Sequence, residues 1–498
     1  MIDILTALIW IGSACASPVA VARDTSASLP DSGAVAGLSP PAASRTPGPP
    51  APVVVLPPVQ VDAALDRARR RAPTAFVTVL GNGHESHALA SLDQTLIEAA
   101  GVRVTQYGGM GAFSTMSLRG APPGHVSVLL DGVPLTSAAH GLVDLASLPA
   151  TAVDVVEVYR GAAPVSLASP TPGGAVNLVT KAASDTRALS VAAGSFGTGE
   201  AQGTFGATHG PWSVLAHGGW QGSDGDYRYH DDNGTPLNPD DDTIAHRVNA
   251  RFDAASALVR GGYAPGDHVQ ASTHVEYFRR GQGVPGPGAT PALTARYAED
   301  RILAAGDARL ARDRNTPALE LSGSFTRQHS NLRDTNGELG YGRVDTHERF
   351  DDAAATAELS SPARWKQLGL RAGGALRAET ARPAAPTAGL DDPPPSHRHT
   401  NSAWLTADLH GLDDRVLLHA ARRWDQQVED ILDTRSTGAI REQSTSRTLV
   451  GAAVGRTFHA LSLLVEGRNL GDQLVEDVAG FPLPGRMVLV SLTVDIPH

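Results

Sequence analysis

Residues 126–135 read VSVLLDGVPL and decide the fold of the N-terminal part of this chain. The apolar β-forming run ends in Asp131-Gly132, a pair that tolerates the positive backbone φ of a tight turn. The sequence therefore predicts a buried strand that reverses direction at Asp131-Gly132. Related strings lie at 117–120 (SLRG), 153–161 (VDVVEVYRG) and 173–181 (GGAVNLVTK).

One helix is expected in the same region. Apolar residues recur at helical spacing through 89–100, and Gly101 follows as a C-terminal stop. Short strands, glycine turns and one helix together predict a small α+β domain over residues 73–182.

Composition excludes several classes of protein. The chain has 498 residues, with 41 basic and 52 acidic side chains and a net charge of -11, which argues against a general nucleic-acid binder. After the N-terminus no run of about 18 apolar residues occurs, so a helical membrane protein is excluded, but membrane-spanning strands are not. No phosphate-binding glycine loop, nucleophile elbow or cysteine–histidine pair is present, and we therefore expect no enzyme.

Strands of alternating polarity fill residues 187–498. In 269–278, for example, Val275 and Tyr277 share one face, and His274 and Glu276 share the other. Short turns alternate with long polar loops near 222–243, 281–296, 330–346, 381–396, 428–443 and 471–485. A soluble sandwich also explains alternation alone, but the turn and loop asymmetry is typical of an outer-membrane barrel, here with about 14 candidate strands.

The N-terminal segment is predicted to be exported and then to act as a tether. Residues 1–22 resemble a secretory signal peptide that contains Cys15, the single cysteine. Residues 23–58 are rich in Pro, Ala, Ser and Gly, and such a segment buries too little apolar surface to order itself. The segment 53–61 can add a strand to a partner's sheet through Val53, Val54, Val55, Val59 and Val61, although composition alone favours a linker that merely contains valines.

The strings at 96–104, 118–120, 130–134, 156–161 and 173–181 occur in the same order as in the plug domain of TonB-dependent outer-membrane receptors, which the chain resembles. The segments 465–474 (VEGRNLGDQL) and 481–485 (FPLPG) resemble the end of the same family's barrels. The resemblance implies an antiparallel transmembrane β-barrel of 14 to 22 strands that encloses a small α+β plug. It also implies a place in the outer membrane of a Gram-negative bacterium, in contact with its lipid.

The resemblance further implies energised uptake of a scarce ligand, an iron-siderophore or a corrinoid such as cobalamin. TonB, with the ExbB/ExbD complex, would bind residues 53–61 and pull on the plug. Two alternatives stay open: a receptor that binds a ligand or protein without transporting it, and a degenerate relative that never assembles. The ending in His498 rather than an aromatic residue favours the second alternative.

The candidate site residues come from the plug strings and the polar loops. In the resembled family, charged plug residues face the barrel wall, which is the role expected here of Arg119, Glu157 and Arg160; the alternative is that each closes a turn. The remaining plug-string positions are Gly120, Asp131, Gly132, Gly161, Gly173, Gly174 and Asn177.

Two further groups are candidate ligand sites. The loop 223–242 concentrates oxygen ligands that suit Ca²⁺, although a solvated acidic loop is the simpler explanation. These candidate ligands are Asp231, Asp232, Asp240, Asp241 and Asp242. His397 and His399, beside a long loop, are candidates for contact with a ligand or iron. No cofactor is required.

Overall fold

The computed structural model describes residues 76–81 and 92–494, apart from short gaps. The gaps are 136–141, 161–163, 165, 168–172, 184–185, 232, 236–237, 267, 287–288, 314–315, 341, 363–367, 385–391, 412–415, 433–440, 444–446, 459–460, 469, 472–475, 479–480 and 483–486. Among the described residues, no helix is long and apolar enough to cross a membrane. The predicted signal peptide, the tether and Val53, Val54, Val55, Val59 and Val61 lie outside this part of the chain.

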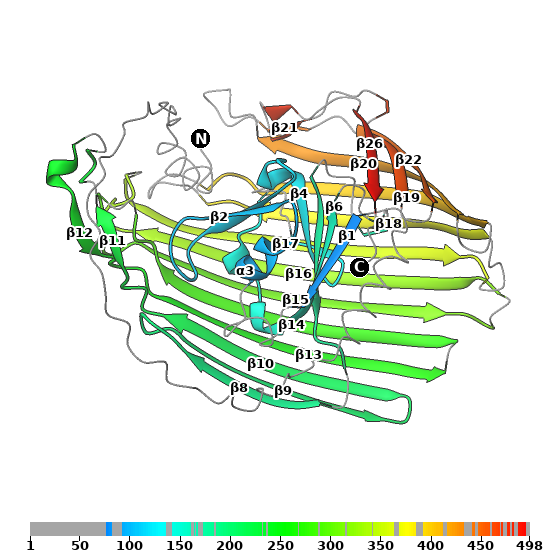
Figure 1. Cartoon of the computed structure of the whole chain (residues 1–498), viewed down its shortest axis with the longest axis horizontal. Coiled ribbons are helices and arrows are strands. Elements are labelled where there is room, and N and C mark those ends of the chain that lie inside the picture. The colour runs from blue at the N-terminus through cyan, green and yellow to red at the C-terminus, as the bar shows by residue number, and fades with distance from the viewer. Residues whose placement is uncertain are drawn as a thin grey trace, which may run out of the picture. The chain divides into compact units, whose positions relative to one another are not determined.

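A five-stranded sheet forms the centre of the N-terminal domain, which we call the plug (Figure 1). Its order is β1 (Phe76–Gly81), β6 (Val153–Arg160), β7 (Gly174–Thr180), β4 (Val126–Leu130) and β5 (Val133–Pro134). The β4 and β7 strands pair in parallel, whereas the other neighbours are antiparallel. Valines and leucines of these strands are buried together with Leu92 and Leu96 of helix α3 (Leu92–Ile97), so the plug has its own apolar core.

Smaller elements complete the plug. A hairpin of β2 (Val102–Gln106) and β3 (Ser114–Leu118) follows the helix, and three 3-10 turns, η1 (Pro123–His125), η2 (Leu145–Ser147) and η3 (Ala150–Ala152), lie between the central strands. The predicted turns are confirmed by backbone φ values of 49° at Asp131 and 85° at Gly132. Arg119 and Gly120 also have the left-handed backbone conformation, with φ values of 52° and 80°.

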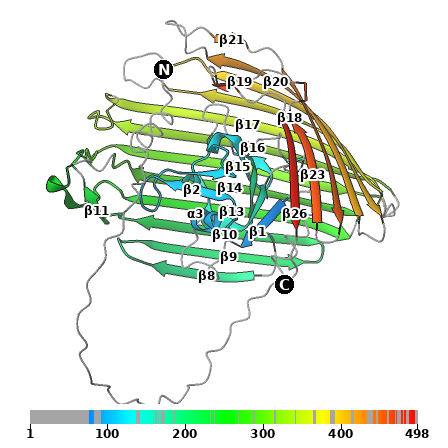
Figure 2. The same cartoon turned by 45° about the horizontal axis from the view of Figure 1, so that its top comes forward.

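The rest of the described chain is mainly one antiparallel sheet, which we call the wall (Figures 1 and 2). Fourteen of its 15 strands follow one another in a continuous path from β8 to β26, and the short β21 (Arg441–Gln443) pairs with β20. The path consists of β8 (Thr186–Ala193), β9 (Gly199–His209), β10 (Trp212–Ser223), β13 (Phe252–Gly266), β14 (Val269–Gly283), β15 (Arg296–Leu310), β16 (Ala318–Asp334), β17 (Val344–Ser360), β18 (Leu368–Arg382), β19 (Ser396–Gly411), β20 (Val416–Leu432), β22 (Arg447–Phe458), β23 (Leu461–Arg468) and β26 (Met487–Val494).

The predicted alternation of short turns and long loops is confirmed. The strand pairs β9–β10 and β13–β14 are joined by two residues each, at 210–211 and 267–268. By contrast, residues 224–251 separate β10 from β13 and carry a small hairpin of β11 (Arg228–Asp231) and β12 (Thr243–His246). A second small hairpin, β24 (Glu476–Val478) and β25 (Phe481–Pro482), lies in the last long connection. Each wall strand runs antiparallel to the one before it, so successive connections lie at opposite ends of the wall. The long connections, which are every second one, therefore all lie at the same end.

Each wall strand presents two different faces. On β14, His274 and Glu276 are buried on the face toward the plug, whereas Val275 and Tyr277 are exposed on the opposite face. On β19, Trp404 and Thr406 are buried and Leu405 is exposed, as the alternating sequence predicts. We call these the inner and outer faces.

Two adjacent glycines on β10 test whether the plug packs on the inner face. A Cβ at Gly219 would lie 2.1 Å from Oγ1 of Thr151 in the plug, whereas a Cβ at Gly218 would meet nothing within 4 Å. We expect Gly219→Val to destabilise the folded protein by about 1–3 kcal/mol through overpacking.

The matched control is Gly218→Val on the outer face. Thermal unfolding of both purified variants in detergent measures the difference. Equal midpoints would show that Thr151 does not pack against β10.

Candidate functional site between the plug and the wall

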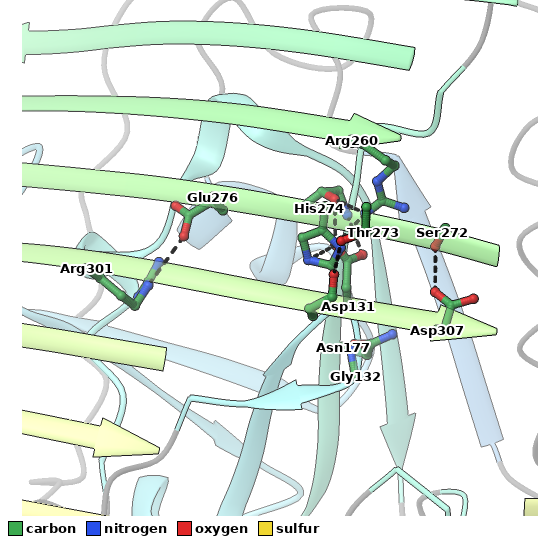
Figure 3. Close-up of polar contacts among 12 residues, drawn as sticks. Asp131, Gly132, Asn177, Arg260, Ser272, Thr273, His274, Glu276, Arg301 and Asp307 are labelled. Atoms are coloured by element: carbon green, nitrogen blue, oxygen red, sulfur yellow. Dashed lines mark hydrogen bonds and ion pairs between the residues drawn. The ribbon is translucent and has the colours of Figure 1, made fainter. Parts of the chain in front are cut away.

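A turn of the plug places Asp131 against two wall strands. Its Oδ2 accepts a hydrogen bond from the Arg260 guanidinium of β13 at 2.6 Å and lies 3.4 Å from Nε2 of His274 on β14. The same carboxylate accepts hydrogen bonds from the backbone N–H and the hydroxyl of Thr180, at 3.0 and 2.6 Å. Figure 3 shows Asp131 beside Arg260 and His274, with Glu276 and Arg301 further along the neighbouring strands. Asp131 therefore connects the plug sheet to the wall.

A second plug carboxylate, Asp144, makes a similar contact with the wall. Its Oδ1 accepts the backbone N–H groups of Ser114 and Ala146, both at 3.0 Å, and the latter bond caps η2. Its Oδ2 accepts a hydrogen bond from Arg280 of β14 at 2.6 Å. Because the Arg280 side chain is only 2% exposed, removing Asp144 would leave a buried guanidinium short of a counter-charge.

Hydroxyl groups of the plug supply further contacts with the wall. Ser147 donates a hydrogen bond to Glu299 of β15 at 2.7 Å, and its carbonyl accepts one from Arg301 at 3.1 Å. Thr151 of η3 and Ser256 of β13 share a hydrogen bond of 2.8 Å. All of these contacts are buried, so they depend on close packing between the plug and the inner face.

Lys181 lies where the plug joins the wall. Its ammonium donates hydrogen bonds to the Thr151 carbonyl and, at 3.2 Å, to Gln202 of β9. Burial lowers the pKa of Lys181, and Asp154 and Glu200 oppose that change. Burial likewise raises the pKa of Asp154 above its ordinary value, which Lys181 opposes. The opposite charges of Asp154 and Lys181 thus favour each other's ionised form inside the protein.

The structure gives Glu157 and Arg160 partners within the plug rather than on the wall. Glu157 accepts hydrogen bonds from Tyr159 and Asn177, both at 2.9 Å, and Asn177 in turn accepts the backbone N–H of Gly132 at 2.9 Å. Arg160 donates to the Ala100 carbonyl and to Thr78. These contacts favour the structural explanation of both charges, and Arg119 occupies the turn before Gly120.

The local structure explains why glycine occupies two of the plug positions. A Cβ at Gly173 would lie 2.7 Å from the His125 carbonyl oxygen, and Gly174 has a φ of 109°, which favours glycine. Gly161 lies outside the described residues.

The aspartates of the loop 223–242 are engaged locally where they are described. Asp231 accepts the backbone N–H of Asn233 at 3.1 Å, and Asp241 accepts the hydroxyl of Thr235 at 2.8 Å. Asp232 lies outside the described residues, which include Asp240 and Asp242. Within the described part of the chain, no group of three or more His, Cys, Asp or Glu side chains could hold a metal ion.

His397 and His399 are exposed at the long-loop end of β19. They alternate with Arg398, which faces inward and binds Glu379 at 2.5 Å, and therefore both lie on the outer face. His397 shares a hydrogen bond of 3.1 Å with Thr380. The structure thus places neither histidine on the inner face with the plug.

The contacts between Asp131 and Arg260 can be measured by a double-mutant cycle. We expect Asp131→Asn and Arg260→Gln each to destabilise the protein, with a coupling energy of about 0.5–3 kcal/mol, because the two groups share one hydrogen-bonded network. The measurement is the free energy of unfolding of both single variants and the double variant in urea and detergent. Additive effects would contradict a direct contact. Arg309→Gln, at the short-turn end, is the control for loss of an arginine.

Known proteins match both parts of the chain. Residues 69–175 match the family model described as the TonB-dependent receptor plug domain. The vitamin B12 transporter BtuB of Vibrio cholerae is 38% identical over 104 residues, which is 21% of this chain and 17% of that relative. The sequence match to this curated relative thus covers less than a fifth of the relative's length.

Solved structures share the fold of the wall as well. The unliganded ferric citrate transporter FecA aligns over 79% of this chain and 62% of its own, with a TM-score of 0.59 and 13% identity. The alcaligin receptor FauA from Bordetella pertussis aligns over 80% and 63%, with a TM-score of 0.57 and 16% identity. The copper transporter OprC aligns over 76% and 59%, with a TM-score of 0.59 and 13% identity.

The two kinds of match agree with the geometry. The sequence match covers the plug, and the structural matches extend over the wall on whose inner face the plug packs. Residues 69–175 thus match the TonB-dependent receptor plug domain, and the fold of the described chain is similar to that of solved outer-membrane receptors and transporters.

Proposed function

We propose that this chain is an outer-membrane receptor that takes up a scarce ligand in a TonB-dependent step. The observation that carries the proposal is a plug domain that packs on the inner face of a strand wall and is joined to it by buried hydrogen bonds and ion pairs. Such a plug blocks passage while it is seated and can be released by pulling. TonB, energised by the ExbB/ExbD complex, would pull on residues 53–61.

The outer face supports a membrane location. On β15, the outward positions from Ile302 to Leu310 carry only apolar side chains and glycine. Outward positions of 269–277, 319–325, 353–359 and 368–378 on the neighbouring strands also carry no charge. A strand needs about 9–11 residues to cross the hydrocarbon core, and the uncharged stretch reaches that length on β14, β15 and β18 and is shorter on β16 and β17. The band can therefore contact lipid tails.

The division of the apolar core supports a releasable plug. Among the described residues, 16 of the 17 buried members of the main apolar cluster belong to the plug, and Leu303 comes from the wall. A smaller apolar cluster crosses the boundary, with Ala152 of the plug against Leu215 and Leu258 of the wall. Separating the plug from the wall would break such contacts together with the hydrogen bonds and ion pairs, while most of the plug core could stay packed. Each such polar contact contributes about 0.5–3 kcal/mol, an amount that can be overcome one contact at a time.

The ligand class follows from the names of the relatives. They transport vitamin B12, ferric citrate and copper, or bind alcaligin. We therefore propose an iron chelate or a corrinoid as the ligand, captured at the long-loop end. No cofactor is needed for this activity, and Ca²⁺ in the loop 223–242 would be an addition to it.

Deletion of residues 53–61 tests the energised step. We expect the deleted chain to lose uptake, because TonB would have no strand to pair with, while its amount in the outer membrane stays unchanged. Growth on limiting iron and, separately, on limiting cobalamin identifies the nutrient. Equal growth of both strains on both nutrients would favour a receptor that binds without transporting.

Spin labels on β19 test the membrane location. A nitroxide at Leu405→Cys, within the uncharged band, should be accessible to oxygen, whereas one at His397→Cys should be accessible to a water-soluble nickel chelate. Both variants are made with Cys15 replaced by serine. High nickel accessibility at both positions would rule out the lipid-facing assignment.

A further inference from the structure

A row of charged side chains runs across the outer face just above the uncharged band. Cross-strand pairing places Arg279 beside Asp300, Asp300 beside His329, His329 beside Arg349, and Arg349 beside Arg382. The row therefore extends over five strands, β14 to β18, at one level. It lies at the long-loop end, because Arg382 is the last residue of β18.

Three arginines within or next to this row converge on one carboxylate. Asp351 lies 2.6 Å from Arg327, 2.8 Å from Arg349 and 3.1 Å from Arg382. Asp351 neutralises only one of the three positive charges, so the group keeps two. We call Arg327, Arg349 and Arg382 the arginine cluster.

The arginine cluster stays accessible from outside. The exposed fractions are 41% for Arg327, 36% for Arg349 and 48% for Arg382, compared with 18% for Asp351. The carboxylate thus fixes the guanidinium groups from below and leaves their outer edges open. Guanidinium groups held in this way suit the bidentate hydrogen bonds of a phosphate.

Apolar side chains begin directly beneath the cluster. The Arg327 guanidinium lies 5.4 Å from the centre of the Phe325 ring, which is 39% exposed. Leu376 follows on β18 and is 63% exposed, and Leu405 on β19 is 55% exposed. A molecule bound at the arginine cluster would thus meet charge at one end and an uncharged surface at the other.

We propose that the arginine cluster binds the phosphate group of an outer-leaflet lipid whose acyl chains pack on the uncharged band. The inference rests on the membrane location in the proposed function, but not on transport. A free phosphate ion would use the arginines and leave the band unused. A lipid phosphate uses both features, and for this reason the lipid is the occupant that the surface fits.

The test compares lipid binding by variants of the full chain purified in detergent. Native mass spectrometry measures bound diphosphoryl lipid A, the same lipid without its phosphates, and inorganic phosphate. We expect R327Q/R349Q/R382Q to bind diphosphoryl lipid A about tenfold more weakly than the unaltered chain, because charge-assisted contacts are lost. The dephosphorylated lipid should bind weakly and equally to both.

A charge-matched control uses three exposed arginines at the short-turn end. Arg187 lies on β8, Arg309 pairs with Glu320 at 3.4 Å, and Arg312 follows β15. The variant R187Q/R309Q/R312Q loses the same charge, and we expect its lipid binding to match that of the unaltered chain. If both triple variants lost binding of diphosphoryl lipid A to the same extent, net charge alone would explain the loss, and the proposal would be overturned.

Asp351→Asn separates binding from a structural role. Removing the carboxylate keeps all three positive charges and takes away the group that orients them, so binding of diphosphoryl lipid A should weaken less than in R327Q/R349Q/R382Q. A loss as large as that of the triple variant would show that Asp351 and the arginines only hold the strands together. Binding of inorganic phosphate as tight as that of the lipid would also overturn the assignment.

The chain lacking residues 53–61 separates this proposal from transport. We expect it to bind diphosphoryl lipid A normally even where uptake is lost. Failure of uptake with normal lipid binding bears on the uptake proposal alone, whereas loss of discrimination between the two lipid A forms bears on the lipid proposal alone.

Discussion

The two-residue period of a β-strand places two different surfaces on the wall, and the rest of the structure depends on that separation. On β14, Glu276 and Arg280 are buried on the inner face, whereas Val275 and Tyr277 are exposed on the outer face. Buried charges are costly unless they are paired, so the inner face needs partners. The plug supplies two of them, Asp131 and Asp144.

The partners of the inner face differ along the wall. In the described part of the chain, hydrogen bonds join the plug to β9, β13, β14 and β15, through residues such as Gln202, Ser256 and Glu299. On β17 to β20, ionisable residues pair with one another: Arg377 with Asp352 at 2.8 Å, and Arg423 with Asp425 at 2.9 Å. Plug displacement would therefore leave the charges of β17 to β20 paired but would remove partners from Arg260 and Arg280. The free-energy cost of displacing the plug therefore arises mainly at β13 and β14, where Arg260 and Arg280 lose their plug partners.

Local chemistry made much of the fold predictable. Asp131-Gly132 and Arg119-Gly120 predict turns because glycine adopts a positive φ without steric cost. Alternating polarity correctly separated Val275 and Tyr277 from His274 and Glu276, since only one register keeps charges off an apolar face. The loop and turn lengths followed from the same pattern.

The candidate site was harder to predict because its residues are far apart in sequence. Asp144 and Arg280 are separated by 136 positions, and no local pattern indicates which inward charge meets which plug carboxylate. An Asp before Leu145 does suggest a cap, but not its wall partner. For Glu157 the sequence left open a contact with the wall and a local structural role, and its partners Tyr159 and Asn177 lie inside the plug. To decide whether a charged side chain pairs with the wall or within the plug, one needs the register of the strands in three dimensions.

A reversible cross-link between the plug and the wall tests the central claim most directly. The hydroxyl oxygens of Thr151 and Ser256 are 2.8 Å apart, so the two side chains meet across the contact between plug and wall, and a disulfide in the variant T151C/S256C would join the two parts covalently. The measurement is ligand uptake by cells that carry this variant, before and after reduction. If the plug must leave the wall during uptake, transport should be absent while the disulfide is intact and should return when it is reduced. Normal uptake with the disulfide fully formed would contradict the account.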